Sequence, residues 1–325
     1  MQKVFKLCVT FVFLSMVVGI AASRASAEPG LLLVAHGSPS AKWNEPVFEF
    51  GRRVAKEVEK RGRFKAVRTA MLEFAKPDVP TAVAELEAAG CDRIIAVPLF
   101  ITPSGHSHFD VPAVLGIYWS PRIAAVLAEE GGRAARPNVP IMLTQTLAEG
   151  DVLQQYALDQ VKKLSKTPED EAIVLLAHGD AEHALMIERL LRRIVTHCCG
   201  KTGISFGNWA GVGVGQEYPS AGLTAINEAL GRKKRVLVVG LYLSTTAANI
   251  HRRGMRTANP RGHIVPGGAP FDKEQVVMSE EALIAHPRLV QWAVETAVAA
   301  LGADEPADGG RRKVTSKVRP ANRRR

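Results

Sequence analysis

Cysteine is scarce in this chain of 325 residues, which contains four. Cys8 falls in the N-terminal segment, and the other three are Cys91, Cys198 and Cys199. An odd number without C-x-x-C spacing supports neither a disulfide framework nor a zinc ribbon. The sequence HCC at 197–199 leaves two interpretations open, a ligand set for a soft metal or buried cysteines near the end of a helix.

Two common cofactor motifs are also missing from the sequence. The glycines of GVGVGQ at 211–216 follow G-x-G-x-G spacing and not the G-x-G-x-x-G spacing of a dinucleotide-binding turn. The H-E-x-x-H signature of zinc proteases does not occur either. We therefore predict no nucleotide cofactor.

Long apolar runs are confined to the N-terminus. Two lysines precede the apolar run 7–20, and Ala-Ser-Ala at 25–27 supplies small residues where a signal peptidase cuts. This pattern predicts a signal peptide over 1–27, a mature protein beginning at Glu28 and a periplasmic location. A retained membrane anchor is the alternative, although the run is shorter than the ~20 residues that span a bilayer.

Positive charge is concentrated at the two ends of the chain. The formal net charge is +10, and eleven lysines and arginines, unopposed by acidic residues, lie in 1–27 and 311–325. Subtracting these eleven leaves −1 for residues 28–310, so the folded part is close to neutral. We therefore predict no nucleic-acid partner.

The basic C-terminal segment, 303–325, has almost no apolar residues to bury and is predicted to be disordered. Such a tail can contact an anionic membrane surface or another polyanion. A solvated tail without a dedicated partner is the alternative.

The chain contains an internal repeat. LLLVAHGS at 31–38 returns as IVLLAHGD at 173–180, which places His36 and His178 142 residues apart. A second pair of similar segments matches Glu73 with Glu217, 144 residues apart. Two pairs of similar segments at nearly the same offset predict a duplicated domain.

Apolar runs and amphipathic segments alternate along both halves of the chain. The predicted strands are 31–35, 68–72, 93–100 and 139–146, then 172–177, 208–214 and 235–242. The predicted helices are 45–61, 78–89, 120–131, 149–164 and 287–301. This order predicts an α/β protein with two similar doubly wound parallel-sheet domains, 28–165 and 172–302, separated by the polar segment SKTPEDE.

Three chemically active side chains follow the first three predicted strands. His36 follows the first strand, Glu73 the second, and His106 lies in the loop after the third. Ligands of open parallel sheets bind beyond the carboxyl ends of the strands, so these side chains are expected to converge on a divalent metal ion. Gly37 and Gly105 would let a bulky ligand approach the backbone. Taken singly, a histidine after a strand is more often a hydrogen-bonded structural residue than a metal ligand.

Three successive motifs carry a resemblance to a known family. HGSPSAKWNEPV, MLEFAKPDVPTAVAEL and VPLFITPSGHSHFDVP resemble, in order, those of the sirohydrochlorin cobaltochelatases and ferrochelatases, the class II tetrapyrrole chelatases. The resemblance covers most of residues 30–165. Residues 172–300 are similar to the same domain more faintly, as in the long, internally duplicated members.

The resemblance implies that sirohydrochlorin binds in a cleft between two similar α/β domains while a divalent ion is inserted. Co²⁺ is the first expectation and Fe²⁺ the next, and Ni²⁺ also accepts imidazole ligands. Position by position, His36 and His106 would hold the metal and Glu73 would be the acidic residue of the site. Ser38, Gly105 and Arg252 are the candidates for contacts with the tetrapyrrole.

The second half departs from this pattern. The position that matches His106 at the offset of the repeat is Ala248. We therefore predict one active site, in the first half, with the second half as the opposing wall and with little effect of a His178→Ala substitution.

Export leaves a second function open, a periplasmic tetrapyrrole or metal carrier that catalyses no reaction. The set His36, Glu73 and His106 favours the chelatase, because a carrier has little use for a base.

Overall fold

The computed structural model describes residues 28–129, 132–212, 218–258 and 271–303. The predicted signal peptide, the basic tail, Glu217 and most of GVGVGQ lie outside these residues. None of the helices in the described ranges is long and apolar enough to cross a bilayer.

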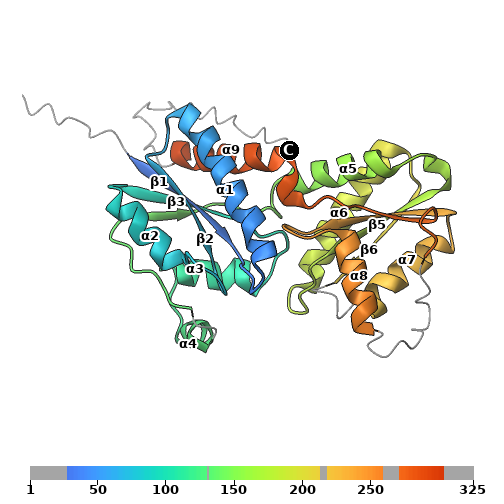
Figure 1. The fold of residues 1–325 in the computed structure, drawn as a ribbon, viewed down its shortest axis with the longest axis horizontal. Helices are drawn as coiled ribbons and strands as arrows, with labels where there is room; N and C mark the ends of the chain where they lie inside the picture. Colours follow the sequence, from blue (N-terminus) through green and yellow to red (C-terminus); the bar gives the residue numbers. More distant parts are fainter. Residues whose placement is uncertain (1–27, 130–131, 213–217, 259–270, 304–325) are drawn as a thin grey trace, which may run out of the picture.

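Two four-stranded parallel sheets form the framework (Figure 1). The first has the order β2-β1-β3-β4 and the second the order β6-β5-β7-β8. The strands are β1 (Pro29–Ala35), β2 (Ala66–Met71), β3 (Arg93–Pro98), β4 (Ile141–Leu143), β5 (Glu171–Ala177), β6 (Phe206–Gly211), β7 (Arg235–Leu241) and β8 (Val276–Met278). The predicted fold class, two doubly wound parallel α/β sheets, is confirmed.

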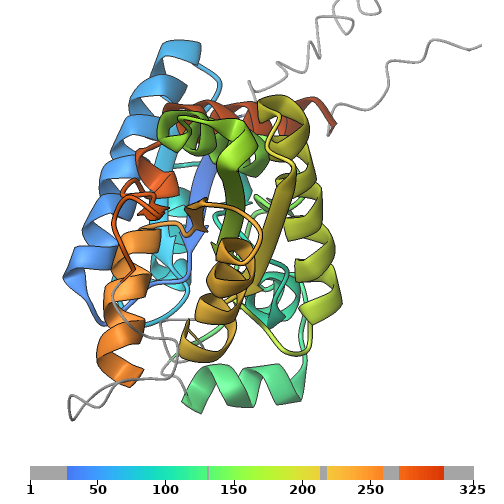
Figure 2. The same ribbon diagram turned by 90° about the vertical axis from the view of Figure 1, so that its right-hand side faces the viewer.

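Helices cover both faces of the sheets (Figure 2). They are α1 (Ala41–Arg61), α2 (Val79–Ala88), α3 (Val111–Val114), α4 (Pro121–Glu129), α5 (Val152–Leu164), α6 (Ala184–Thr202), α7 (Leu223–Leu230), α8 (Ala247–Ala258) and α9 (Pro287–Ala303). Short turns at His106–Asp110, Pro168–Asp170, Tyr218–Gly222 and Leu283–Ala285 link them.

The structure differs from the predicted elements at α6, α7 and α8, for which no ranges were predicted, and at the fourth strands. The predicted strand 139–146 is limited to β4, and β8 corresponds to no predicted strand. Both are three-residue edge strands, too short to show a period of two. Helix α1 begins four residues earlier than predicted, so that Pro46 lies inside it.

The central strands are buried on both faces. All seven residues of β1 and all seven of β5 are buried, as expected for strands between two layers of helices. Along β1, Leu31 and Leu33 belong to a hydrophobic cluster that continues into the second sheet. Leu32 and Val34 belong to a separate cluster with α2.

The last helix of each half packs on the other sheet. Helix α9 packs against α1 and β3 of the first sheet, while α5 packs against α6 and β7 of the second. Figure 1 shows α9 above the first sheet and α5 above the second. Each sheet is therefore covered by helices from both halves of the chain.

Candidate functional site

The site lies where the strand order of the first sheet reverses. Strand β1 pairs with β2 on one side and with β3 on the other, so the chain leaves β1 at the switch point of the sheet. His36 directly follows β1, and Glu73 follows β2 by two residues. The N–H of Glu73 donates to the carbonyl of His36 at 2.9 Å, which holds the two loops together.

Gly37 makes the close approach of these loops possible. Its φ is +92°, and a Cβ at this position would lie 2.0 Å from the carbonyl oxygen of Glu73. A side chain fits neither that backbone conformation nor that space. The structure thus gives Gly37 a role in packing against the Glu73 loop, and the approach of a bulky ligand there stays a prediction.

His106 comes from the loop after β3 and begins a π-helical turn, His106–Asp110. The turn brings Asp110 beside the histidine, with Oδ2 2.8 Å from Nδ1 of His106. Glu73, whose side chain is 4% exposed, places Oε1 3.5 Å from the same nitrogen. Two carboxylates thus face the inner side of one imidazole, and the role of Asp110 had no signal in the sequence beyond its position four residues after a histidine.

The tautomers of the two histidines follow from their partners. Nδ1 of His36 lies 2.8 Å from the carbonyl of Gly37, which can only accept, so Nδ1 carries the proton. Nδ1 of His106 likewise donates to Asp110. In both neutral rings the lone pair is therefore on Nε2. Metal-binding histidines typically make a hydrogen bond of this kind with the ring nitrogen that does not bind the metal, here Nδ1.

The two Nε2 atoms face each other at 3.2 Å. Two metal–nitrogen bonds of ~2.0–2.1 Å spanning this separation would meet at an angle of about 100°, between octahedral and tetrahedral geometry. Two lone pairs at this distance repel each other unless a cation lies between them. The geometry therefore suits a divalent ion held by His36 and His106.

Burial keeps His36 in the form that binds metal. Desolvation lowers its pKa, the carbonyl of Gly37 opposes this shift, and the nearby charges of His106 and His178 lower the pKa further. His36 consequently stays neutral at a pH where an ordinary histidine takes up a proton.

Among the described residues, His36, Glu73 and His106 are the one group of three or more His, Cys, Asp and Glu whose ligand atoms all lie within 4.8 Å of one another. The HCC sequence on α6 does not belong to such a group. Burial raises the pKa of Cys198 to about 12, which disfavours the thiolate that binds metal.

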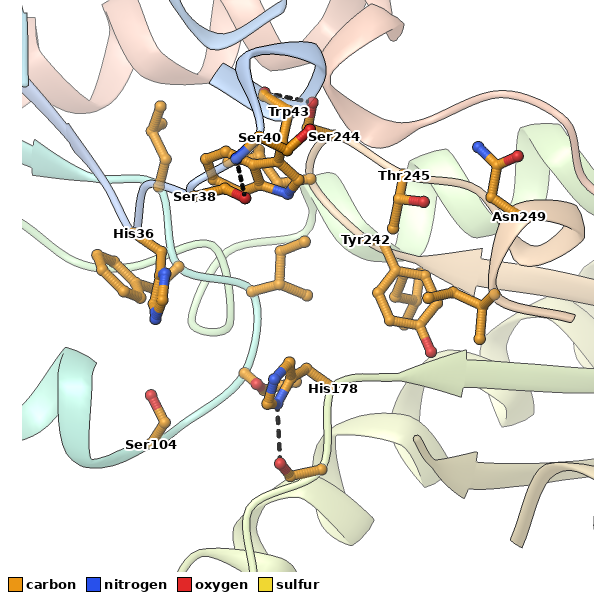
Figure 3. A pocket seen from close by; sticks show the side chains of 18 of the residues that line it. His36, Ser38, Ser40, Trp43, Ser104, His178, Tyr242, Ser244, Thr245 and Asn249 are labelled. Carbon is orange, nitrogen blue, oxygen red and sulfur yellow. Dashed lines mark hydrogen bonds between the residues drawn. The ribbon is translucent and has the colours of Figure 1, made fainter. Parts of the chain in front are cut away.

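The histidine pair opens into a cavity of about 570 Å³ between the two sheets (Figure 3). His36, Ser38, Trp43 and His106 line it from the first half of the chain, and His178, Asp180, Tyr242 and Arg252 are among the lining residues of the second. Glu73 and Gly105 do not line it.

Two hydrogen bonds join the halves of the chain beside the cavity. The hydroxyl of Ser244 donates to the carbonyl of Trp43 at 2.7 Å, and the N–H of Gly105 donates to Asp180 at 3.3 Å. Of the three predicted ring contacts, the structure brings Ser38 and Arg252 into the cavity, and it gives Gly105 this contact with Asp180 instead.

The family model that matches the chain is CbiX, over residues 30–164. This part of the chain belongs to the CbiX family. The predicted family is thereby confirmed, while internal duplication and export remain predictions.

The curated relatives match this segment over short stretches of sequence. It is 34% identical over 88 residues to the sirohydrochlorin cobaltochelatase of Methanococcus maripaludis, covering 27% of this chain and 58% of that protein. It is 35% identical over 88 residues to the sirohydrochlorin cobaltochelatase of Saccharolobus solfataricus, covering 27% and 64%. The chain thus spans less than two thirds of the length of these relatives.

Solved structures match both sheets. The sirohydrochlorin chelatase SirB of Bacillus subtilis subspecies spizizenii, in complex with cobalt, has a TM-score of 0.57 and 15% identity, covering 86% of this chain and 97% of its own. SirB from Bacillus subtilis with Fe³⁺ has a TM-score of 0.59 and 15% identity, covering 86% and 100%. At this identity the similarity establishes the fold of the chain alone, including its second sheet.

Proposed function

We propose that this protein is a chelatase that inserts a divalent metal ion into sirohydrochlorin. The observation that carries the proposal is the pair of Nε2 atoms of His36 and His106, 3.2 Å apart at the wall of an interdomain cavity. The CbiX family of residues 30–164 and the names of the relatives supply the class of substrate.

The cavity is chemically suited to a flat polycarboxylate. Lys42 on α1 and Arg252 and Arg253 on α8 line it. Ammonium and guanidinium groups bind carboxylates, which sirohydrochlorin carries around its rim. Trp43 and Tyr242 add aromatic surface for the macrocycle.

The residues of the first half would deliver the metal. His36 and His106 bind the incoming ion through Nε2 and release it as the nitrogens of the macrocycle take their place. The carboxylates of Glu73 and Asp110 offset the charge of the ion and orient His106. Glu73 acts from behind the histidine, because it does not line the cavity.

Cobalt is the proposed metal, with Fe²⁺ next and Ni²⁺ third. Imidazole nitrogen accepts all three, and selection among them in cells rests on supply and geometry more than on raw affinity. We also propose that the protein acts in the periplasm, on the strength of the N-terminal sequence 1–27.

The test is an anaerobic insertion assay. The purified protein is mixed with sirohydrochlorin and Co²⁺, Fe²⁺ or Ni²⁺, and the absorption spectrum of the ring is followed against a protein-free control. We expect faster insertion with at least one metal, and loss of that acceleration in His106→Ala with unchanged circular dichroism.

Two results would contradict the proposal. Tight binding of the ring without faster insertion would identify a carrier, the alternative function. Normal turnover by His106→Ala would show that the metal is held elsewhere.

A further inference from the structure

Metal insertion releases two protons, and the residues described so far do not account for them. The macrocycle enters with two pyrrole N–H groups and leaves with the metal bound to its four nitrogens. His36 and His106 are occupied by the metal during this exchange, and Glu73 is buried behind His106. A base on the open surface of the cavity would speed the removal of these protons.

The acidic residue of the opposite wall is not available as that base. Asp180 lines the cavity, but its Oδ1 accepts the N–H groups of Glu182 and His183 and its Oδ2 accepts that of Gly105. Burial raises the pKa of Asp180, but the hydrogen bonds from His183 and Gly105 outweigh this and lower it. A carboxylate held in this way is a poor proton acceptor.

The other lining side chains that titrate are also unsuited. Lys42, Arg252 and Arg253 are cations, and the hydroxyl of Tyr242 donates to the carbonyl of Val212 at 3.0 Å. Among the described residues that line the cavity, this leaves His178.

His178 has the geometry of His36 on the opposite sheet. It directly follows β5 as His36 follows β1, and its Nδ1 donates to the carbonyl of Gly179 at 2.8 Å, the distance found between His36 and Gly37. The lone pair of its neutral ring is therefore on Nε2. Figure 3 shows the rings of His178 and His36 among the side chains that line the cavity.

We propose that His178 is the proton acceptor of the insertion reaction. The assignment rests on the proposed chelatase function. The metal approaches from His36 and His106, and Nε2 of His178 takes one pyrrole proton to become imidazolium. It passes this proton to water and then accepts the second. Four metal–nitrogen bonds to the ring form as the bonds to His36 and His106 break, and two protons reach the solvent. This assignment differs from the small effect of His178→Ala expected from the sequence, where Ala248 stands at the position that matches His106.

The experiment compares insertion by the full chain and by three variants of His178. We expect His178→Ala to lower kcat by about 10²-fold, within the range of general-base catalysis, with little change in KM. His178→Gln keeps the size and hydrogen bonding of the side chain but cannot take up a proton, so it should be as slow. His178→Glu offers a carboxylate and should recover part of the rate.

The matched control is His197→Ala, a histidine of the same half that lies on α6 and does not line the cavity. It should insert metal at the normal rate. Calorimetric titration with Co²⁺ should give the same affinity for the wild type and for His178→Ala, since the ion is held by His36 and His106.

Normal turnover by His178→Gln would overturn the assignment. A fall in Co²⁺ affinity in His178→Ala would overturn it as well, because His178 would then be a metal ligand. Absence of insertion by the wild type would overturn the proposed function and this assignment together, whereas an active wild type with an equally active His178→Ala would overturn this assignment alone.

Discussion

Asp110 shows how much of the proposed metal site depends on a residue that is not one of its proposed ligands. Its carboxylate lies 2.8 Å from Nδ1 of His106, and this contact fixes the tautomer that presents Nε2 to the cavity. A carboxylate in this position also strengthens the imidazole as a ligand.

We expect Asp110→Asn to lower Co²⁺ affinity by about 10- to 100-fold, the usual effect of removing such a partner. Affinity would be measured by calorimetry. The control is Asp92→Asn, because Asp92 accepts the backbone N–H of Glu28 and does not line the cavity. Equal affinities in the two variants would show that Asp110 does not orient His106.

Gly37 and Gly105 flank the two histidines but differ in what they require of the backbone. A Cβ at Gly37 would meet the carbonyl of Glu73 at 2.0 Å, whereas a Cβ at Gly105 would have nothing within 4 Å. The φ of Gly105 is −52°, which any residue adopts.

We expect Gly37→Ala to destabilise the protein by at least about 1–3 kcal/mol through backbone strain, with a further cost from the clash. Gly105→Ala should leave the stability unchanged or slightly higher. Urea denaturation measures both. Similar stabilities for the two variants would contradict this account of the loop.

Helix α2 is stabilised at its start by Asp78. The carboxylate accepts the N–H of Thr81 at 3.1 Å and also contacts the Thr81 hydroxyl and Lys76. Burial raises the pKa of Asp78, but these hydrogen bonds outweigh it and bring the pKa to about 2 from an ordinary 3.8. The helix begins one residue later and supports β1 and β2 from one face.

Asp78→Ala should cost about 1 kcal/mol of stability near neutral pH, as for other helix caps. Because the folded pKa lies below the unfolded one, this contribution is full above pH 3.8 and is lost as the pH falls from 3.8 towards about 2. The measurement is urea denaturation of both proteins at several pH values.

Asp151 provides the matched control, since it precedes α5 without a side-chain hydrogen bond to the helix. Asp151→Ala should have a smaller effect. A constant difference between wild type and Asp78→Ala down to pH 2 would refute the electrostatic part of the argument.

Helix α5 of the first half packs on the second sheet, and helix α9 of the second half packs on the first sheet. This exchange of helices joins the two sheets into one structure. A single hydrophobic cluster runs from β1 through residues of α5 and α9 to β5. A large apolar interface of this kind opposes free movement of the two sheets. It also holds His36 and His178 on opposite walls of one cavity.

Cutting the chain between the halves tests this coupling. Residues 28–165 lack α9 and expose the surface of α1 and β3 that it covers, so we expect this fragment to aggregate or remain unfolded when expressed alone. Co-expressed with 166–325, it should form a soluble one-to-one complex. Size-exclusion chromatography with light scattering measures both, and a cooperatively folding monomer of 28–165 would contradict the expectation.

Much of the fold was predictable because it depends on local patterns. Fully apolar runs predict β1, β3 and β5, and the rule that ligands bind beyond the carboxyl ends of parallel strands predicts that His36, Glu73 and His106 lie together. The edge strands β4 and β8 were not predictable to the same degree, because three residues carry too little pattern.

The sequence was sufficient to predict the family, the parallel sheets and the candidate metal-binding histidines, since these follow from periodicity and from motifs along the chain. The tertiary structure decided the positions and contacts of Asp110, Gly37 and His178. Each depends on distances between segments that are separated in sequence or on the direction of a side chain, and the exchange of α5 and α9 depends on packing across the two halves. These distances and contacts cannot be predicted from a local sequence pattern, because they depend on which surfaces pack together when the chain folds.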